Sequence, residues 1–391
     1  MKITGYRVEQ YLMRMDRAVG DANLPEGVDL MPGSILFLET DGNLTGLALG
    51  YGGGAVAMLY PAIEGEDPRE AIGLWMRLND WVHKGGNEGE ANAALSIIDV
   101  ALWDLKAKAA GEPLWRTLGA TEGRVKAYAS GLDYCLSDDE LYAFYRRMAE
   151  QGIDAGKLKV GLDLRADLRR LGIMREALCV ASARPRLMID ANEYWSPKQA
   201  VRYIRQLEAK FDLEWVEEPA RRWDYDGLRL VSQQVSAAVA TAENINGLSD
   251  VYPLIANQAV DVVNVSALHS GVTGCRQIAR MAQTFELPVS MMNCQANFMA
   301  HIAAALPNHT MMEVVDPGRE HCLKFNSYIE DGHIVLGEEP GFGIQIDEAA
   351  LAELKANPPR GRGRFPFPRR EGAGRYLVPP RDGEVPWRRG P

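Results

Sequence analysis

Residues 186–218 of the chain read RLMIDANEYWSPKQAVRYIRQLEAKFDLEWVEE. The two ends of this stretch, 186–190 and 214–218, are short apolar runs of the kind that form buried strands. Between them, residues 196–211 repeat apolar side chains at the helical period, and the Ser-Pro pair that opens this segment is a helix start signal. The stretch therefore predicts one strand, one helix and a second strand.

The same pattern repeats from about residue 125 to residue 320. Short apolar runs lie at nearly constant intervals, and amphipathic segments such as 271–285 separate them. The eight runs cover residues 125–129, 157–160, 186–190, 214–218, 237–240, 261–265, 287–291 and 310–314. Eight strands that are each followed by a helix predict a (β/α)8 barrel over residues 125–320, because a doubly wound sheet rarely needs eight evenly spaced units.

The N-terminal third, residues 1–124, has a different pattern. Two strand-like runs, 35–40 and 44–49, flank the turn residues Asp41-Gly42-Asn43 and indicate a hairpin, while residues 92–110 have a helical pattern. We therefore expect an α+β capping domain in residues 1–124.

Two segments follow the predicted barrel. Residues 321–356 contain a second hairpin signal at 328–336 and are expected to return to the cap. Residues 357–391 are rich in Pro, Gly and Arg, with nine arginines against three acidic residues, and cannot form a core of their own. This tail is expected either to bind anions or to lie extended along its own or a neighbouring subunit.

Composition excludes several classes of protein. The chain has 391 residues, of which 47% are hydrophobic and 25% charged, and its mean hydropathy is -0.21, as in soluble globular proteins. A net charge of -10 repels a phosphate backbone, so we expect no nucleic acid partner. Because no long apolar segment or signal peptide is evident and the five cysteines form no CxxC pair, we expect a cytoplasmic chain with no membrane partner.

Acidic residues stand at the predicted C-terminal ends of three successive barrel strands. They are Asp190, Glu217 and Glu243. In a barrel these ends converge on one face, where three unpaired carboxylates would repel one another and raise their pKa values. Such a set of oxygen ligands suits Mg²⁺, so we expect a magnesium site here, although any one of these acids alone could cap the following helix.

Two neighbours of these acids have alternative roles. Asn192 lies on the same side of an extended chain as Asp190, so it either binds a ligand or stabilises the turn. Glu218 points to the side opposite Glu217, and we expect it in a structural ion pair or in contact with a metal ligand.

Two lysines on the preceding strand are the candidate bases. Lys157 and Lys159 alternate with Leu158, so both ammonium groups should face the barrel mouth. We expect burial beside a divalent cation to lower the pKa of such a lysine toward that of a usable base. A lysine that faces a metal can remove the proton α to a carboxylate, while the metal neutralises the enediolate that forms.

Motifs along nearly the whole chain resemble the enolase superfamily, in its mandelate racemase and muconate lactonizing enzyme branch. The motifs lie at residues 101–106, 111–114, 157–159, 190–192, 216–219, 242–244, 271–274 and 341–344. The resemblance implies that Asp190, Glu217 and Glu243 bind Mg²⁺. It also implies that Lys159 is the base for the α-proton and that Lys157 assists electrostatically.

The resemblance also implies how a substrate is held. Glu313 ends the eighth strand, where relatives use a carboxylic acid to hydrogen-bond the enolising carboxylate of the substrate. Cap loops, here 17–29 and 51–59, are expected to close over that substrate, with Arg17 as a candidate clamp for a carboxylate. Relatives assemble as dimers or octamers, so a homo-oligomer is expected.

The sequence departs from the family pattern on the sixth and seventh strands. Mandelate racemase-like members use an Asp-His pair there and muconate lactonizing types a lysine, but residues 264–269 hold no Asp or Lys, and Asn293 stands at the place of the His. His269 and Cys294 are substitute acids, unless the former is structural and the latter an inert thiol.

One base is enough to dehydrate a hydroxy acid or acid sugar through an enediolate, and this is the predicted reaction on a small carboxylate substrate. The alternatives are an epimerase, racemase or cycloisomerase with an unusual second acid, and a non-catalytic descendant that only binds a ligand.

Overall fold

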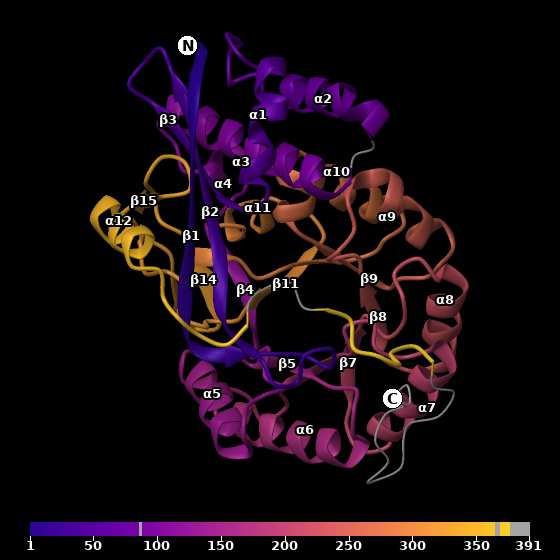
Figure 1. Ribbon diagram of the computed structural model, residues 1–391. Helices are drawn as coiled ribbons and strands as arrows, with labels where there is room; N and C mark the ends of the chain where they lie inside the picture. Colours follow the sequence, from indigo (N-terminus) through magenta and orange to yellow (C-terminus); the bar gives the residue numbers. More distant parts are fainter. Residues whose placement is uncertain (86–87, 364–367, 376–391) are drawn as a thin grey trace, which may run out of the picture.

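The computed structural model describes residues 1–85, 88–363 and 368–375. At its centre, eight parallel strands pair in chain order from β4 to β11, and the pairing of β11 with β4 closes the barrel (Figure 1). The strands are β4 (Arg124–Ser130), β5 (Ala155–Lys159), β6 (Arg186–Asp190), β7 (Leu213–Glu217), β8 (Ala238–Thr241), β9 (Val262–Val265), β10 (Val289–Met291) and β11 (His309–Val314). The predicted (β/α)8 barrel is confirmed, and each predicted run contributes one strand.

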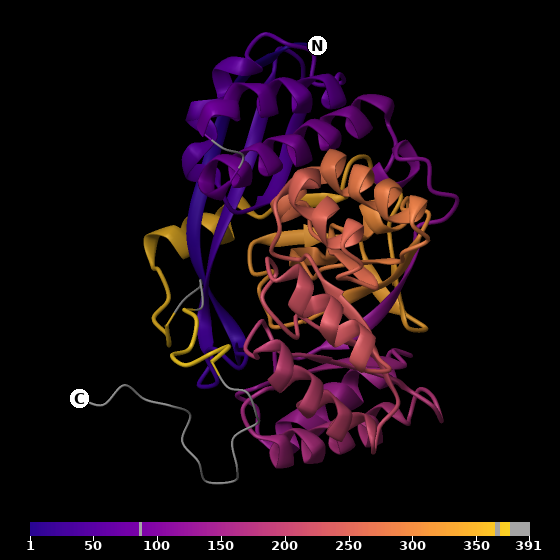
Figure 2. The same ribbon diagram turned by 90° about the vertical axis from the view of Figure 1, so that its right-hand side faces the viewer.

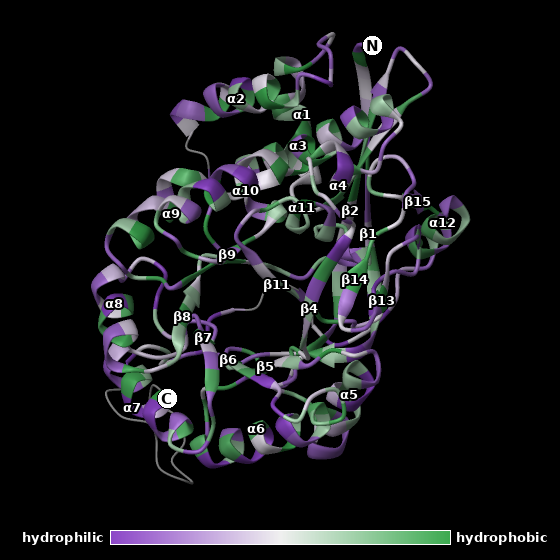
Figure 3. Ribbon diagram, turned by 180° about the vertical axis from the view of Figure 1, so that it is seen from behind, coloured by the Kyte–Doolittle hydropathy of each residue, from purple (hydrophilic) through white to green (hydrophobic). Residues whose placement is uncertain are grey.

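Helices form a ring around these strands. They are α5 (Asp138–Glu150), α6 (Leu164–Leu178), α7 (Pro197–Glu208), α8 (Tyr225–Gln234), α9 (Gly247–Ala256), α10 (Ala267–Thr284) and the single turn α11 (Ala300–Ala303), which η4 (Gln295–Asn297) precedes. Ser196 caps α7 by accepting a hydrogen bond from the Gln199 backbone N–H at 3.3 Å. Hydrophilic and hydrophobic residues alternate along the ring helices, as expected of helices that cover a sheet on one side and face water on the other (Figure 3).

Side chains that point into the barrel form two layers of opposite character. The lower layer, which we call the barrel floor, is apolar and consists of Tyr128, Ala155, Met188, Trp215, Ala240, Val262 and Met311. Two residues farther along most of these strands the buried side chains are polar, namely Ser130, Lys157, Asp190, Glu217, Asn264 and Glu313. Because side chains two apart on a strand share a face, the polar layer lies directly above the dry floor.

The cap is a three-stranded antiparallel sheet with helices on one side. Its strands are β1 (Ile3–Val19), β2 (Val28–Thr40) and β3 (Thr45–Gly50), paired in that order. Its helical segments are η1 (Gly53–Ala55), α1 (Val56–Leu59), η2 (Tyr60–Ala62), α2 (Ala71–Val82), η3 (His83–Gly85), α3 (Gly89–Ala110) and α4 (Leu114–Thr117). Helix α3 packs against both β3 and α10, so it joins cap to barrel. The far end of the β1–β2 hairpin reaches the mouth of the barrel (Figure 2).

The segment after the barrel touches both parts. It contains β12 (Leu323–Phe325), β13 (Tyr328–Glu330), β14 (His333–Val335), β15 (Ile344–Ile346) and α12 (Glu348–Ala356). The β13–β14 hairpin pairs with the barrel strand β4, whereas α12 packs on β1 of the cap. The tail predictions for residues 364–367 and 376–391 lie outside the described residues. None of the described helices combines the length and the apolar character needed to cross a membrane.

Candidate active site

A cavity of about 650 Å³ lies between the barrel mouth and the cap. The barrel contributes residues at or shortly after the strand ends: Lys159, Asn192, Glu218, Glu243, His269, Asn293, Cys294 and Glu313. The cap contributes Asp21, Asn23 and Met31 from the β1–β2 hairpin and Tyr51 from the segment after β3. Both cap loops singled out in the sequence therefore reach the cavity.

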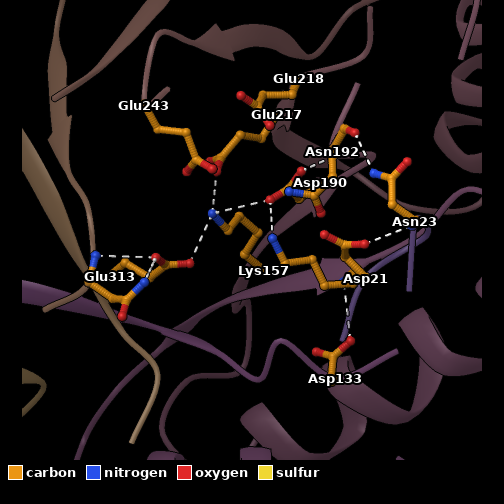
Figure 4. Close-up of polar contacts among 12 residues, drawn as sticks. Asp21, Asn23, Asp133, Lys157, Asp190, Asn192, Glu217, Glu218, Glu243 and Glu313 are labelled. Carbon is orange, nitrogen blue, oxygen red and sulfur yellow. Dashed lines mark hydrogen bonds and ion pairs between the residues drawn. The ribbon is translucent and has the colours of Figure 1, made fainter. Parts of the chain in front are cut away.

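The three acids proposed as metal ligands are buried side by side. Asp190 and Glu217 are paired in register at the ends of β6 and β7, and Glu243 lies two residues beyond β8. Figure 4 shows Lys157 among these carboxylates. Its Nζ contacts Glu217 Oε1 and lies 3.6 Å from Asp190 Oδ2, while Lys159 Nζ contacts Asp190 Oδ2.

The donor set fits a hard divalent cation. Burial raises the pKa of Glu217 well above its usual range, although Lys157 opposes this. Burial also raises the pKa of Glu243 to about 8, and the nearby acids add to the rise. These buried carboxylates need positive charge, and oxygen ligands of this kind are those that Mg²⁺ accepts. Lys157 and Lys159 supply positive charge to these carboxylates. Among the described residues, no group of three or more His, Cys, Asp or Glu side chains has the arrangement of a metal site.

The expected lowering of the lysine pKa values beside a divalent cation stays a prediction, because the charged groups nearest to both lysines here are carboxylates. Burial by itself lowers the pKa of Lys157. The attraction of nearby acidic groups, chiefly Glu217 and Glu313, outweighs burial and raises the pKa well above its usual value. In Lys159 burial acts in the same direction, and the combined attraction of Asp190, Glu243 and Glu313 outweighs it, so the pKa is raised. The physical reason is that the nearest neighbours of both ammonium groups are carboxylates. Lys157 also differs from Lys159 in that it does not line the cavity.

A polar group stands on the β10–β11 side of the cavity. Asn293 Nδ2 donates a hydrogen bond to Glu313 Oε2 at 2.9 Å, and Arg319 Nη2 donates to Asn293 Oδ1 at 2.6 Å. Burial would raise the pKa of Glu313, but Lys157 and other donors lower it to about 2, so this acid is ionised. Lys157 Nζ lies 3.0 Å from Glu313 Oε1. Sequence reasoning missed Arg319, because it lies in an irregular loop without a motif.

The two substitute acids line the cavity but are poorly suited to proton transfer near neutral pH. Burial, with a contribution from Arg222, lowers the pKa of His269 to about 4, so its imidazole is neutral. Burial raises the pKa of Cys294 to about 12, and its sulfur accepts a hydrogen bond from the Met299 N–H at 3.2 Å. His269 can therefore bind a substrate as a neutral ring, and Cys294 remains a thiol.

Positive φ angles redirect the chain just beyond the strand ends. Asn192 at 45°, Glu218 at 43° and Ala242 at 100° have left-handed backbones, which are rare for residues other than glycine and cluster at functional sites. The turn at Glu218 corrects the expectation that this acid faces away: it lines the cavity and accepts a hydrogen bond from Asn244 Nδ2 at 3.0 Å. Among the described residues it has no ion pair, and burial raises its pKa to about 8.

Of the two remaining candidate residues, Asn192 lines the cavity and Arg17 does not. The backbone N–H of Asn192 donates to Asp190 Oδ1 at 2.8 Å, and its side chain lines the cavity, where Oδ1 finds no partner among the described residues. Arg17 does not line the cavity. Its two Nη atoms donate to the carbonyls of Gly131 and Val315, so it fastens the end of β1 to the barrel instead of reaching a substrate.

Sequence comparison identifies relatives of the chain. Residues 40–119 match the family described as "Mandelate racemase / muconate lactonizing enzyme, N-terminal domain", and residues 140–350 match "Enolase C-terminal domain-like". A 3,6-anhydro-alpha-L-galactonate cycloisomerase of Streptomyces coelicolor is 30% identical over 81% of this chain and 90% of its own length. An L-talarate/galactarate dehydratase of Salmonella typhimurium is 31% identical over 73% of this chain and 71% of its own.

Structural comparison agrees. The crystal structure of a racemase from Streptomyces coelicolor with bound magnesium superposes with a TM-score of 0.82 at 27% identity. The match covers 90% of this chain and 99% of that one.

Proposed function

Because the chain belongs to the mandelate racemase and muconate lactonizing enzyme branch of the enolase superfamily, we propose that it removes the proton α to the carboxylate of a hydroxy acid or acid sugar and dehydrates that substrate. The observation that carries this proposal is the placement of Lys159. It is a buried lysine at the end of β5 that lines the cavity beside Asp190. An amine in this place can reach a proton on a bound acid.

Asp190, Glu217 and Glu243 are the residues that would hold Mg²⁺. When bound, the ion supplies positive charge that stabilises the enediolate and lowers the barrier to proton removal. Relatives with bound magnesium support this choice of metal.

Residues of the chain would transfer the protons, balance the charge of the carboxylates and bind the substrate. Lys159 Nζ, as the free amine, takes the α-proton, and the C–O bond of the β-hydroxyl breaks. The ammonium formed on Lys159 can return its proton to that hydroxyl when it leaves from the same face, which releases water and an enol that tautomerises to a 2-oxo acid. Lys157 touches the carboxylates without lining the cavity, so it balances charge. Asn293 and Arg319 offer hydrogen-bond donors to the substrate's oxygens.

Asn293 favours elimination over racemisation. Racemisation needs a proton donor on the face opposite the base, and a carboxamide does not titrate near neutral pH and so does not act as a general acid. The second candidate is epimerisation or cycloisomerisation. His269 and Cys294 line the cavity as the proton donors for it, although their shifted pKa values make both poorly suited to donate a proton near neutral pH. The cycloisomerase among the relatives also favours it.

A screen of acid sugars with Mg²⁺ in D2O tests the proposal. We expect NMR to show a 2-oxo acid product, and we expect Lys159→Ala to slow its formation by at least about 100-fold, in line with the loss of a general base. Lys126→Ala, near the N-terminal end of β4, outside the cavity lining and paired with Asp154, is the matched control and should act like the unchanged enzyme. Deuterium at the α-carbon without loss of water would instead indicate an isomerase. Binding of acids without exchange or turnover would indicate a non-catalytic descendant.

A further inference from the structure

The described parts of the C-terminal tail lie beside the cap loop and the cavity. Both family matches end at or before residue 350, so the tail is outside them. Its first described part runs along the cap loop: the backbone N–H of Arg362 donates to Asp29 Oδ1, and the Asp29 N–H donates back to the Arg362 carbonyl at 3.1 Å. Figures 1 and 2 both show this yellow segment beside the end of the β1–β2 hairpin.

The second described part of the tail, residues 368–375, is attached to both sides of the cavity. The Arg370 N–H donates to Asn23 Oδ1 of the cap at 3.2 Å, and Asn23 Nδ2 in turn donates to the Asn192 carbonyl at 3.0 Å. On the barrel side, the Gly374 N–H donates to the Tyr194 carbonyl at 2.6 Å. Arg369 directly precedes the residue whose backbone is bound to the cap, and this attachment places it at the cavity.

Arg369 lines the same cavity as Lys159. Near it, the buried carboxylate of Glu193 receives Arg222 Nε at 2.6 Å and Arg221 Nη1 at 3.0 Å. Burial and then the repulsion from Arg221 lower the pKa of Arg369, although Glu193 opposes this, so the Arg221 and Arg369 guanidinium groups repel each other.

The end of the cavity near Glu193 carries arginine side chains that can bind an anion. Arg221, Arg222 and Arg369 all line it, and Arg221 Nε is buried without a partner among the described residues. Glu193 pairs with Arg221 and Arg222, whereas Arg369 has no carboxylate partner among the described residues and donates only to the Glu193 carbonyl, at 3.5 Å. A planar guanidinium with free N–H groups is the side chain best suited to a carboxylate.

We propose that Arg369, carried by the tail, and Arg221 form a subsite for a second carboxylate of the substrate, so that the enzyme prefers acid sugars with two terminal carboxylates to those with one. The proposal rests on the proposed function, because the first carboxylate is the one that is enolised beside Lys159. One ligand can meet both ends, since Lys159 and Arg369 line one cavity whose volume of about 650 Å³ is in the range of sites that enclose small molecules.

Calorimetric binding of galactarate and galactonate, with Mg²⁺ present, tests the subsite. The two acids share their carbon chain and the configuration of their common hydroxyl groups and differ at one terminus. Measurements in a Lys159→Ala background keep either acid from reacting. We expect galactarate to bind at least about 10-fold more tightly, the effect of one charge-assisted hydrogen bond.

Two tail variants locate the effect. Arg369→Gln should weaken galactarate binding about 10-fold and change galactonate binding by no more than about 2-fold. Arg360→Gln is the matched control: it removes an exposed arginine of the same tail that does not line the cavity, and it should leave both affinities unchanged.

Several results would overturn the subsite. They are equal affinities for the two acids, an Arg369→Gln variant that weakens both acids alike, and no binding of either. The proposed function fails separately: selective binding of galactarate, with no exchange or dehydration by the enzyme that retains Lys159, would contradict the reaction and still support the subsite.

Discussion

Replacing Asp99 by asparagine probes a buried carboxylate between the cap and the barrel. Asp99 lies on α3, is fully buried, and faces α10. Its Oδ2 accepts the backbone N–H of Thr273 at 2.8 Å and its Oδ1 accepts the Thr273 hydroxyl at 2.7 Å. Gly271, with φ of 61°, passes so close that a Cβ there would lie 2.5 Å from Asp99 Oδ2. The carboxyl group is therefore enclosed by backbone.

Burial raises the pKa of Asp99 from 3.8 to about 7, against the hydrogen bonds from Thr273. The folded protein then keeps a proton that the unfolded chain releases above pH 4. Stability falls as the pH rises through the window from about 4 to about 7, by up to about 1.4 kcal/mol per pH unit, and the loss is complete above it. Between pH 4.5 and 8 this single group should remove about 3 kcal/mol from the free energy of unfolding.

The asparagine variant carries no such proton. We expect Asp99→Asn to cost about 1 kcal/mol at pH 4.5, since one acceptor oxygen is lost, and to become more stable than the unchanged protein by pH 8. Urea unfolding of both proteins across this range gives the difference directly, and other titrating groups cancel in it. Asp226→Asn, at a side chain that is 85% exposed, is the control and should show a difference that does not vary with pH. A constant difference for Asp99→Asn would refute the reasoning.

Three further predictions concern other buried groups. Because burial lowers the pKa of His269 to about 4, His269→Gln should leave the shape of the pH–rate profile unchanged between pH 5.5 and 8, and a missing limb would contradict this. The exposed Cys179 should react with iodoacetamide at pH 7.5 well before Cys294, whose pKa burial raises to about 12; mass spectrometry of the labelled peptides would reveal the reverse order. Tyr145→Phe should lower the free energy of unfolding by about 1.5–3 kcal/mol, because the buried hydroxyl lies 2.6 Å from Asp133 Oδ2; a urea midpoint that does not move would count against this.

Much of the fold was predictable because its signals are local. A Ser-Pro pair starts α7, the short apolar runs recur at a regular spacing, and eight such runs favour a barrel over a doubly wound sheet. The carboxyl ends of all the strands in a barrel lie at the same face, whatever conformation the following loops adopt. Asp190, Glu217 and Glu243 could therefore be assigned to one face of the molecule before any contact was known.

The chemistry of the site depends on backbone turns and on contacts between residues far apart in the sequence, which the spacing of apolar residues does not predict. Glu218 turns into the cavity because its φ is positive, and an alternating strand pattern predicts the opposite face. Arg17 lies on a segment predicted to close over the substrate, but two carbonyls from distant parts of the barrel bind it. Nothing in the sequence near Arg319 marked it as part of a cavity, and for Arg369 the sequence indicated only an arginine-rich tail that either binds anions or lies extended.

The order of apolar and polar residues along the chain was enough to establish the barrel, the cap and the strand ends that carry the acids, since hydrophobic burial acts on patterns repeated every few residues. Contacts between residues far apart in the chain established which ammonium group lines the cavity, which sign each pKa shift takes, and that the tail brings Arg369 to the barrel mouth. Electrostatic and hydrogen-bond energies depend on distance in space, and only the folded chain defines those distances.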